Sequence, residues 1–323
     1  MSAASDDDVL SSAAARWRRT DPLLPDPEPP AGPGCGAELT VPAMNGRAAA
    51  IGWCRHRQVE PEAAELAWGA AGQFWLTAMV SGDPAEPGME AALDELLARW
   101  GEHLAAEPAT AGHDTQAAVR WPSRDIGGVR ALLRHGLLPL TVIAARPAGR
   151  AMPEATPWPG DLRIRPAGPG DVAAVTALSL EVIRFDQHFG GVQFRPHAER
   201  AQRHQAEQTL ARPDPWTWLA ERDGQAVGLL VAEPPDRAGW MAAATGPSPV
   251  AYLATLSVLP GERGAGVGTA LVAGLHRDLD AAGVKVTLLH HGQLNPLSVP
   301  FWSRMGYRPL WTSWEIRPAR ALR

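Results

Sequence analysis

One stretch of sequence decides the fold of the second half of this 323-residue chain: Val258-Leu-Pro-Gly-Glu-Arg263-Gly264-Ala265-Gly266-Val267-Gly268-Thr269. It lies between an apolar segment typical of a strand and a segment with apolar residues at helical spacing. The first amides of a helix have no intrahelical partner, and glycines leave them open to an anionic ligand. The stretch therefore predicts a strand, a tight turn and a helix whose start binds phosphate.

The spacing of the glycines narrows the class of ligand. A dinucleotide-binding turn needs Gly-x-Gly-x-x-Gly, and no such run begins at Gly264 or at Gly266. A nucleoside-triphosphate loop needs Gly followed by Lys and then Ser or Thr, whereas Val267 follows Gly266. Arg263 adds a positive charge at the start of the turn. These observations favour a pyrophosphate-bearing ligand of another class.

The elements around this turn alternate between strands and helices. The dipeptide Asp223-Gly224 predicts a hairpin, and Gly283 predicts the end of the helix that starts near Thr269. Strands are expected at 162–166, 216–222, 226–233, 252–258 and 284–288 and in a last segment ending near 316; other helices are expected at 170–182 and 296–305. We therefore expect an α/β fold with a mixed, mostly antiparallel twisted sheet flanked by helices, and a parallel strand pair beside the turn.

A second motif follows downstream: Asn295-Pro-Leu-Ser298-Val-Pro-Phe301-Trp302-Ser-Arg-Met-Gly306-Tyr307. Together with the Arg-x-x-Gly-x-Gly of residues 263–268, it resembles the two ordered motifs of the GNAT acetyltransferase superfamily. The resemblance covers residues 162–317. It implies an enzyme that takes acetyl-CoA as co-substrate, without a metal, and transfers the acetyl group directly to a primary amine of a small-molecule or peptide acceptor.

The resemblance also assigns roles to single residues. It implies that backbone groups of Leu256, Ser257 and Val258 pair with the pantetheine arm, and that Asn295 hydrogen-bonds it, while Ser298, Phe301 and Trp302 line its thiol end. It implies that the turn holds the pyrophosphate through Arg263, Gly264, Ala265, Gly266, Val267, Gly268 and Thr269. Many members of the family have a tyrosine at the position of Trp302, where it protonates the leaving thiolate. An indole cannot do so, and Ser303, Tyr252 or water would have to replace it.

The base that accepts the proton of the attacking amine is less clear from the sequence. An alkyl amine is mostly protonated at neutral pH, so a base must lie within reach. Tyr252 on the strand before the turn, and His290 and His291 at the end of the next strand, are the candidates; Glu233 ends the hairpin and is expected to be solvated. A histidine titrates in the useful range, and the alternative for the His pair is a structural position at the strand end.

The first half reads as a degenerate repeat of the second. Arg134-His-Gly136-Leu-Leu-Pro-Leu mirrors Arg304-Met-Gly306-Tyr-Arg-Pro-Leu, and an ungapped alignment of Val80 with Val258 places Ala85, Glu86, Pro87 and Glu90 where the turn has Arg263, Gly264, Ala265 and Gly268. Carboxylates repel a pyrophosphate, so this half is expected not to bind coenzyme A. We expect a mobile, Pro-rich arm (1–35), a degenerate GNAT-like domain (36–146), a linker (147–160) and an acetyl-CoA-binding GNAT domain (161–323).

Composition limits the remaining functions. The net charge of −5 argues against nucleic acid or anionic membrane as a partner, and no stretch is long and apolar enough for a membrane span. Cys35 and Cys54 have no metal-ligand spacing, and the acidic start of the chain is unlike a signal peptide. We expect a cytoplasmic protein that is a monomer, as a tandem pseudo-dimer, or a weak homodimer. The alternative function is a non-catalytic acyl-CoA-binding regulatory protein.

Overall fold

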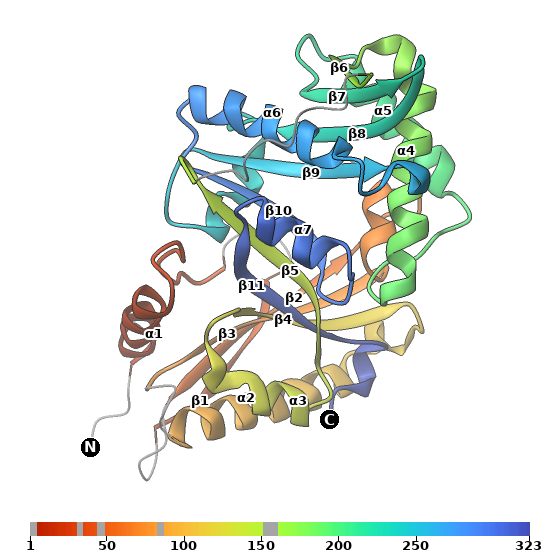
Figure 1. The fold of residues 1–323 in the computed structure, drawn as a ribbon. Coiled ribbons are helices and arrows are strands. Elements are labelled where there is room, and N and C mark those ends of the chain that lie inside the picture. The colour runs from red at the N-terminus through yellow and green to blue at the C-terminus, as the bar shows by residue number, and fades with distance from the viewer. Residues whose placement is uncertain (1–4, 31–34, 44–48, 83–86, 151–160) are drawn as a thin grey trace. The chain divides into compact units, whose positions relative to one another are not determined.

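The computed structural model describes residues 5–30, 35–43, 49–82, 87–150 and 161–323. The chain forms two compact units (Figure 1). Unit 1 comprises 1–61, 69–142 and 309–323, and unit 2 comprises 62–68 and 143–308. The sheet is mixed and mostly antiparallel in both units, as the sequence predicts.

Unit 2 contains the glycine-rich turn. Its sheet has the strand order β10-β9-β8-β7-β6, and β9 and β10 are parallel, which confirms the predicted parallel pair. Its strands are β6 (Arg163–Pro166), β7 (Thr217–Arg222), β8 (Gln225–Glu233), β9 (Val250–Val258) and β10 (Val286–Gly292); its helices are α4 (Val172–Asp186), α5 (Ala198–Leu210), α6 (Val267–Ala281) and α7 (Ser298–Arg304). The sequence patterns missed α5 and the 3-10 segment Ala238–Ala244 between β8 and β9.

Helices cover both faces of this sheet because neighbouring residues of β8 point to opposite sides. Leu229 packs with Leu178 of α4 and Leu210 of α5 in one apolar cluster. The adjacent Gly228 faces α6, where an added Cβ would lie 2.8 Å from Val267 and 3.1 Å from Leu271. The absence of a side chain at Gly228 therefore lets α6 pack closely on β8 and fixes where this helix begins.

Unit 1 repeats this plan, with the sheet order β1-β2-β3-β4-β11 and a parallel β3–β4 pair. Its helix α2 buries Leu93, Leu96 and Trp100 against the sheet. The strands are β1 (Cys35–Val41), β2 (Ala50–Gln58), β3 (Gly72–Val80), β4 (Thr115–Pro122) and β11 (Arg308–Ile316); the helices are α1 (Asp6–Thr20), α2 (Pro87–Ala106) and α3 (Val129–Arg134); β5 (Leu138–Pro147) is divided between the units after Val142.

The repeat extends to individual hydrogen bonds at the ends of α3 and α7. In α3 the amide of His135 donates to the carbonyl of Ala131, and in α7 the amide of Met305 donates to the carbonyl of Phe301. The two amides that follow each of these also make matching bonds in the two helices. Gly136 and Gly306 both have positive φ, +80° and +86°. This left-handed conformation favours glycine, so both copies of the motif end their helix in the same way.

The expectation of a mobile arm over residues 1–35 is wrong for its first part. Residues 6–20 form α1, which begins with a capping box between Ser5 and Asp8. Val9, Ala13 and Trp17 are buried at a helical spacing of four, and the buried Arg16 forms a 2.9 Å ion pair with Asp125 in unit 1. The Pro-rich composition hid this short amphipathic segment, whose burial offsets its ordering entropy.

The units also differ from the expected consecutive domains. The last strand of the chain, β11, pairs antiparallel with β4 and so belongs to unit 1. A short segment of the first half, Ala64–Trp68, belongs to unit 2, where Ala67 packs with Leu180 and Ile183 of α4. Linear boundaries could not reveal this, because strand pairing between distant segments defines the units.

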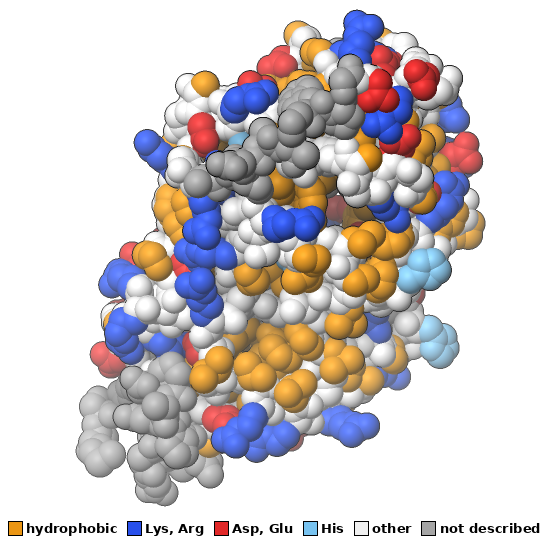
Figure 2. Space-filling view, in the orientation of Figure 1, with side chains coloured by type: hydrophobic (Ala, Val, Ile, Leu, Met, Phe, Trp, Pro, Cys, Tyr) orange, Lys and Arg blue, Asp and Glu red, His pale blue; other side chains and the backbone are white. Residues whose placement is uncertain are grey.

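Three further features bear on the expected partners. No helix in the described ranges is long and apolar enough to cross a membrane. Within the same ranges, no group of three His, Cys, Asp or Glu side chains has a metal-binding arrangement. On the face drawn in Figure 2, basic and acidic side chains are interspersed. The small-molecule acceptor and the oligomeric state stay predictions.

Candidate active site

The glycine-rich turn leaves the start of α6 open. Gly264 and Gly266 both have φ near +85°, and nothing lies within 4 Å of a Cβ built on either. Gly266 is the N-cap residue of α6 and makes no side-chain cap. Within the described residues, no acceptor bonds the amides of Gly264 or of residues 266–269, whereas Ala265 and Arg263 make long bonds of 3.4 Å inside the turn. Partial positive charge at a helix start favours an anion there.

The turn is closed on one side by α7. A Cβ on Gly268 would lie in van der Waals contact with Phe301, at 3.4 Å, and with Val258, at 3.6 Å, so the turn packs directly against the aromatic ring. Phe301 in turn packs edge-on against Trp302, with ring centroids 4.9 Å apart. The two predicted motifs, far apart in sequence, therefore meet at Gly268 and Phe301.

Strands β9 and β10 separate next to this turn. Their ladder comprises four pairs and ends at Leu253 and Leu289, although β9 continues to Val258. On its other edge, β9 shifts register against β8: Leu253 pairs with Ala232 and Thr255 with Val231, which leaves Ala254 as an extra residue. Ala254 is exposed in a central strand. A bulge of this kind bends its strand, and here it opens the β10 side of residues 254–258, which include Leu256, Ser257 and Val258.

The side chain of Arg263 folds back on unit 2. Its Nε donates to the carbonyl of Val258 (3.1 Å), its Nη2 lies 3.4 Å from Glu181, and its guanidinium stacks over Phe185 at 4.4 Å. The sequence could not show these partners on α4. The positive charge of Arg263 is therefore partly balanced by a carboxylate.

Asn295 is held by the protein through both ends of its amide. Its nitrogen donates to Asp186 (2.7 Å), and its oxygen accepts from the amides of Leu297 (2.9 Å) and Ser298 (3.1 Å), which caps α7. Burial raises the pKa of Asp186 to about 6, against the opposing effects of Asn295 and Arg263. The predicted bond from Asn295 to a ligand stays a prediction, and the structure adds Asp186, which no motif identified.

Two of the three base candidates come together. The hydroxyl of Tyr252 lies 3.0 Å from Nδ1 of His290, and both are half-buried beside the point where β9 and β10 separate. Burial, and then the nearby Glu233, raise the pKa of Tyr252 above its usual value. His291 lies on the opposite face of β10, buried, with Nδ1 3.1 Å from the carbonyl oxygen of Gly292, and burial lowers its pKa. The geometry joins Tyr252 and His290 and leaves His291 out.

Trp302 is buried beside Tyr307. This tyrosine does not serve as the general acid that an indole at position 302 cannot provide. The hydroxyl of Tyr307 bonds Nε2 of the buried His276 at 2.9 Å, and burial raises the pKa of this tyrosine. Two tryptophans that follow along the chain lie in unit 1: Trp311 packs edge-on against Trp17, and Trp314 lies in the core.

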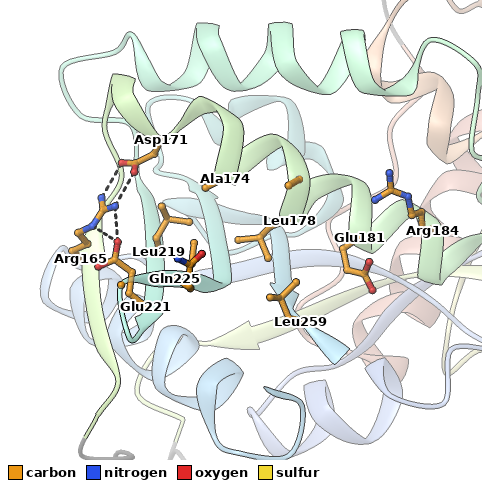
Figure 3. A pocket seen from close by; sticks show the side chains of 13 residues that line it. Arg165, Asp171, Ala174, Leu178, Glu181, Arg184, Leu219, Glu221, Gln225 and Leu259 are labelled. Carbon is orange, nitrogen blue, oxygen red and sulfur yellow. Dashed lines mark hydrogen bonds and ion pairs between the residues drawn. The ribbon is translucent and has the colours of Figure 1, made fainter. Parts of the chain in front are cut away.

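A pocket of about 520 Å³ lies along α4, next to the turn (Figure 3). Arg165 closes one end through bonds of 2.7–2.8 Å to Asp171 and Glu221. Leucines of α4, β7 and the residue after β9 line its middle, and Glu181, the partner of Arg263, lies at the other end. The pocket therefore borders the turn through Glu181 and Leu259.

The equivalent place in unit 1 is built differently. Glu90, aligned with Gly268, accepts a 3.0 Å bond from Arg130 and a second bond from Arg134, both on α3. An ion pair thus replaces the glycine–phenylalanine contact of unit 2. Strands β2 and β3 pair in one continuous register, without the shift seen between β8 and β9. Ala85 and Glu86, which the alignment places at the positions of Arg263 and Gly264, lie outside the described residues.

Comparisons with known proteins agree with this geometry. Residues 180–307 match the family model described as Acetyltransferase (GNAT) family. A mycothiol acetyltransferase of Frankia alni is 30% identical over 119 residues, an alignment covering 35% of this chain and 36% of that protein. A GCN5-related N-acetyltransferase of Sphaerobacter thermophilus has a TM-score of 0.51 at 18% identity, covering 84% of this chain and 81% of the other. A GCN5-related N-acetyltransferase of Kribbella flavida has a TM-score of 0.44 at 15% identity, covering 95% and 93%.

Residues 180–307 thus carry the match to the GNAT superfamily of acetyltransferases. The arrangement is a tandem one: the run β1-β2-β3-α2-β4-α3 of unit 1 repeats as β7-β8-β9-α6-β10-α7 in unit 2, and the segment that matches the family lies within unit 2. The chain aligns with about a third of the length of its mycothiol acetyltransferase relative, 36%.

Proposed function

We propose that unit 2 binds acetyl-CoA and transfers its acetyl group to a primary amine of a small-molecule or peptide acceptor. The observation that supports this most concerns the start of α6, where the amides of residues 266–269 bond no acceptor in the described part of the chain. They lie next to a strand whose edge is open over residues 254–258. Amides and the helix start suit the pyrophosphate, and the open strand edge suits the amide groups of pantetheine. Residues 256–258 and 263–269, with Asn295, Ser298, Phe301 and Trp302, would form this site.

The thioester would then lie where β9 and β10 part, beside Tyr252 and His290. The amine attacks the carbonyl carbon, its C–N bond forms as the C–S bond breaks, and the amine proton passes to the Tyr252–His290 pair. The thiolate takes up one proton, from water or from Tyr252, since Trp302 cannot supply it. A coenzyme thiol with a pKa near ~8.5 is a tolerable leaving group, so the reaction proceeds without a dedicated acid.

Two measurements test the proposal. Calorimetric titration with acetyl-CoA should show one site, in unit 2. Release of free thiol from acetyl-CoA should then depend on an added amine, across a panel of alkyl amines, amino sugars and peptide N-termini. Binding without amine-dependent thiol release would favour the alternative, a non-catalytic acyl-CoA-binding regulatory protein. Absence of binding would contradict both.

A further inference from the structure

A cluster of aromatic and acidic side chains surrounds the Tyr252–His290 pair. The indole Nε1 of Trp240 donates a 2.7 Å bond to Glu233, the last residue of β8. The Trp240 ring packs edge-on against Tyr252, with centroids 4.8 Å apart, and lies parallel to the His290 ring at 6.4 Å. Glu233 and Tyr252 are paired across β8 and β9. Four side chains from three strands and the 3-10 segment Ala238–Ala244 therefore form one contiguous group in unit 2.

The group lies at the mouth of the opening between β9 and β10. Tyr252 pairs with Leu288 just before the ladder ends, and His290 follows its last residue, Leu289. Trp240 is 59% exposed, an unusual state for an indole. Glu233 makes no ion pair among the described residues, and its carboxylate accepts the hydrogen bond from Trp240. An indole face and an unpaired carboxylate are thus presented to solvent beside the pair proposed to accept the amine proton.

We infer that Glu233 and Trp240 form the subsite that receives the acceptor as an ammonium ion. This inference rests on the proposed function and names the chemical class of its acceptor: an amine basic enough to be protonated at neutral pH. A cation is attracted by the face of an indole and by a carboxylate, and a neutral analogue of the same shape is not. The ammonium loses one proton to the Tyr252–His290 pair as it moves inward, the pair releases this proton to water, and the neutral amine then attacks.

Benzylamine, which is protonated at pH 7.5, and benzyl alcohol, its neutral analogue, are suitable probes. Their dissociation constants are measured by ligand-observed NMR on the full chain, with and without coenzyme A, so that the result does not depend on turnover. We expect the parent protein to prefer benzylamine at least about 10-fold. Glu233→Gln and Trp240→Leu should each lower this preference several-fold, within the range of ~2- to 30-fold that such a contact supports, and Trp240→Phe should restore most of it.

The control is Glu199→Gln, which removes a charge of the same sign from the exposed face of α5; its preference should match that of the parent. Equal affinity of the parent protein for the two probes would overturn the inference. So would an unchanged preference in both Glu233→Gln and Trp240→Leu. If acetyl-CoA fails to bind while benzylamine is still preferred in a Glu233-dependent way, the proposed function fails and the ammonium subsite stands.

Discussion

The side-chain nitrogen of Asn295 donates a 2.7 Å hydrogen bond to Asp186, and this bond joins the loop before α7 to the end of α4. The oxygen of the same amide caps α7. Asn295 is buried, so each of these bonds replaces one to water that the residue gave up on folding. Asn295 therefore holds together two helices that flank the proposed coenzyme site.

Replacing Asn295 by alanine should destabilise unit 2 by about 1–3 kcal/mol, because it leaves Asp186 and the first amides of α7 without their partner. Urea unfolding at pH 7 measures this free energy. Asn295→Asp keeps an oxygen for the α7 amides but places a second carboxylate beside Asp186, so its stability should improve as the pH falls and one of the two carboxylates is protonated. A stability of Asn295→Ala within about 0.5 kcal/mol of the parent would contradict this role.

Arg263→Glu should abolish acetyl-CoA binding. The change places a carboxylate at the proposed phosphate site and next to Glu181, which Arg263 now contacts at 3.4 Å. Calorimetric titration checks the affinity, and Arg203→Gln on the exposed surface of α5 serves as the control for loss of a positive charge. An affinity equal to that of the parent would show that the turn is not the phosphate site.

Gly266→Ala should lose stability and coenzyme affinity together. Its φ of +85° costs an L-residue about 1–2 kcal/mol, and relief of that strain would close the turn. Gly274→Ala in the same helix is the matched control, because an added Cβ meets nothing nearer than Arg277 at 4.0 Å. That variant should gain about 0.5–1 kcal/mol and keep its affinity. Thermal unfolding and titration of the two variants distinguish strain at the turn from a general effect of adding a methyl group.

Substitution of Glu90 should leave coenzyme affinity unchanged, as should substitution of Glu86. Glu90 forms ion pairs with Arg130 and Arg134 at the place where unit 2 has Gly268. These arginines are exposed, so Glu90→Gln should cost no more than about 1 kcal/mol. Titration with acetyl-CoA checks the prediction. A large loss of affinity in either variant would mean that unit 1 also holds coenzyme.

The stability of the protein should decrease on acidification through His276. Burial, assisted by Arg146, lowers the pKa of His276 from 6.5 to about 3, so the unfolded chain binds a proton there that the folded chain does not. Its stabilising contribution is complete above pH 6.5 and is lost as the pH falls towards 3, with a slope of at most ~1.4 kcal/mol per pH unit. His276→Gln, which can still bond Tyr307, should flatten the curve of unfolding free energy between pH 7 and 5.

Protonation of Asp186 changes the unfolding free energy in the opposite direction over part of this pH range. Its folded pKa of about 6 lies above the unfolded value of 3.8, so its contribution improves as the pH falls through 6. Comparing His276→Gln with the parent cancels this effect, because Asp186 is present in both. Parallel curves for the two proteins would contradict the assignment to His276.

The order of elements in unit 2 could be predicted from local signals. Asp223 and Gly224 both have positive φ in the β7–β8 turn, and Gly283 ends α6 with φ +74°, as the sequence implied. Such positions are set by the conformational freedom of single residues. The amphipathic helix α1 was missed because its apolar residues are few.

Part of the candidate site could also be predicted from local sequence signals. The sequence by itself determined the glycine-rich turn, the helix after it and the degenerate repeat, because backbone freedom, helical spacing and motif order are properties of short segments. Only the tertiary structure placed Tyr252 against His290, Asn295 on Asp186, Trp240 beside Glu233, and the last strand in unit 1. Those contacts join segments whose spacing along the chain has no fixed relation to their distance in space, so packing and strand register decided them.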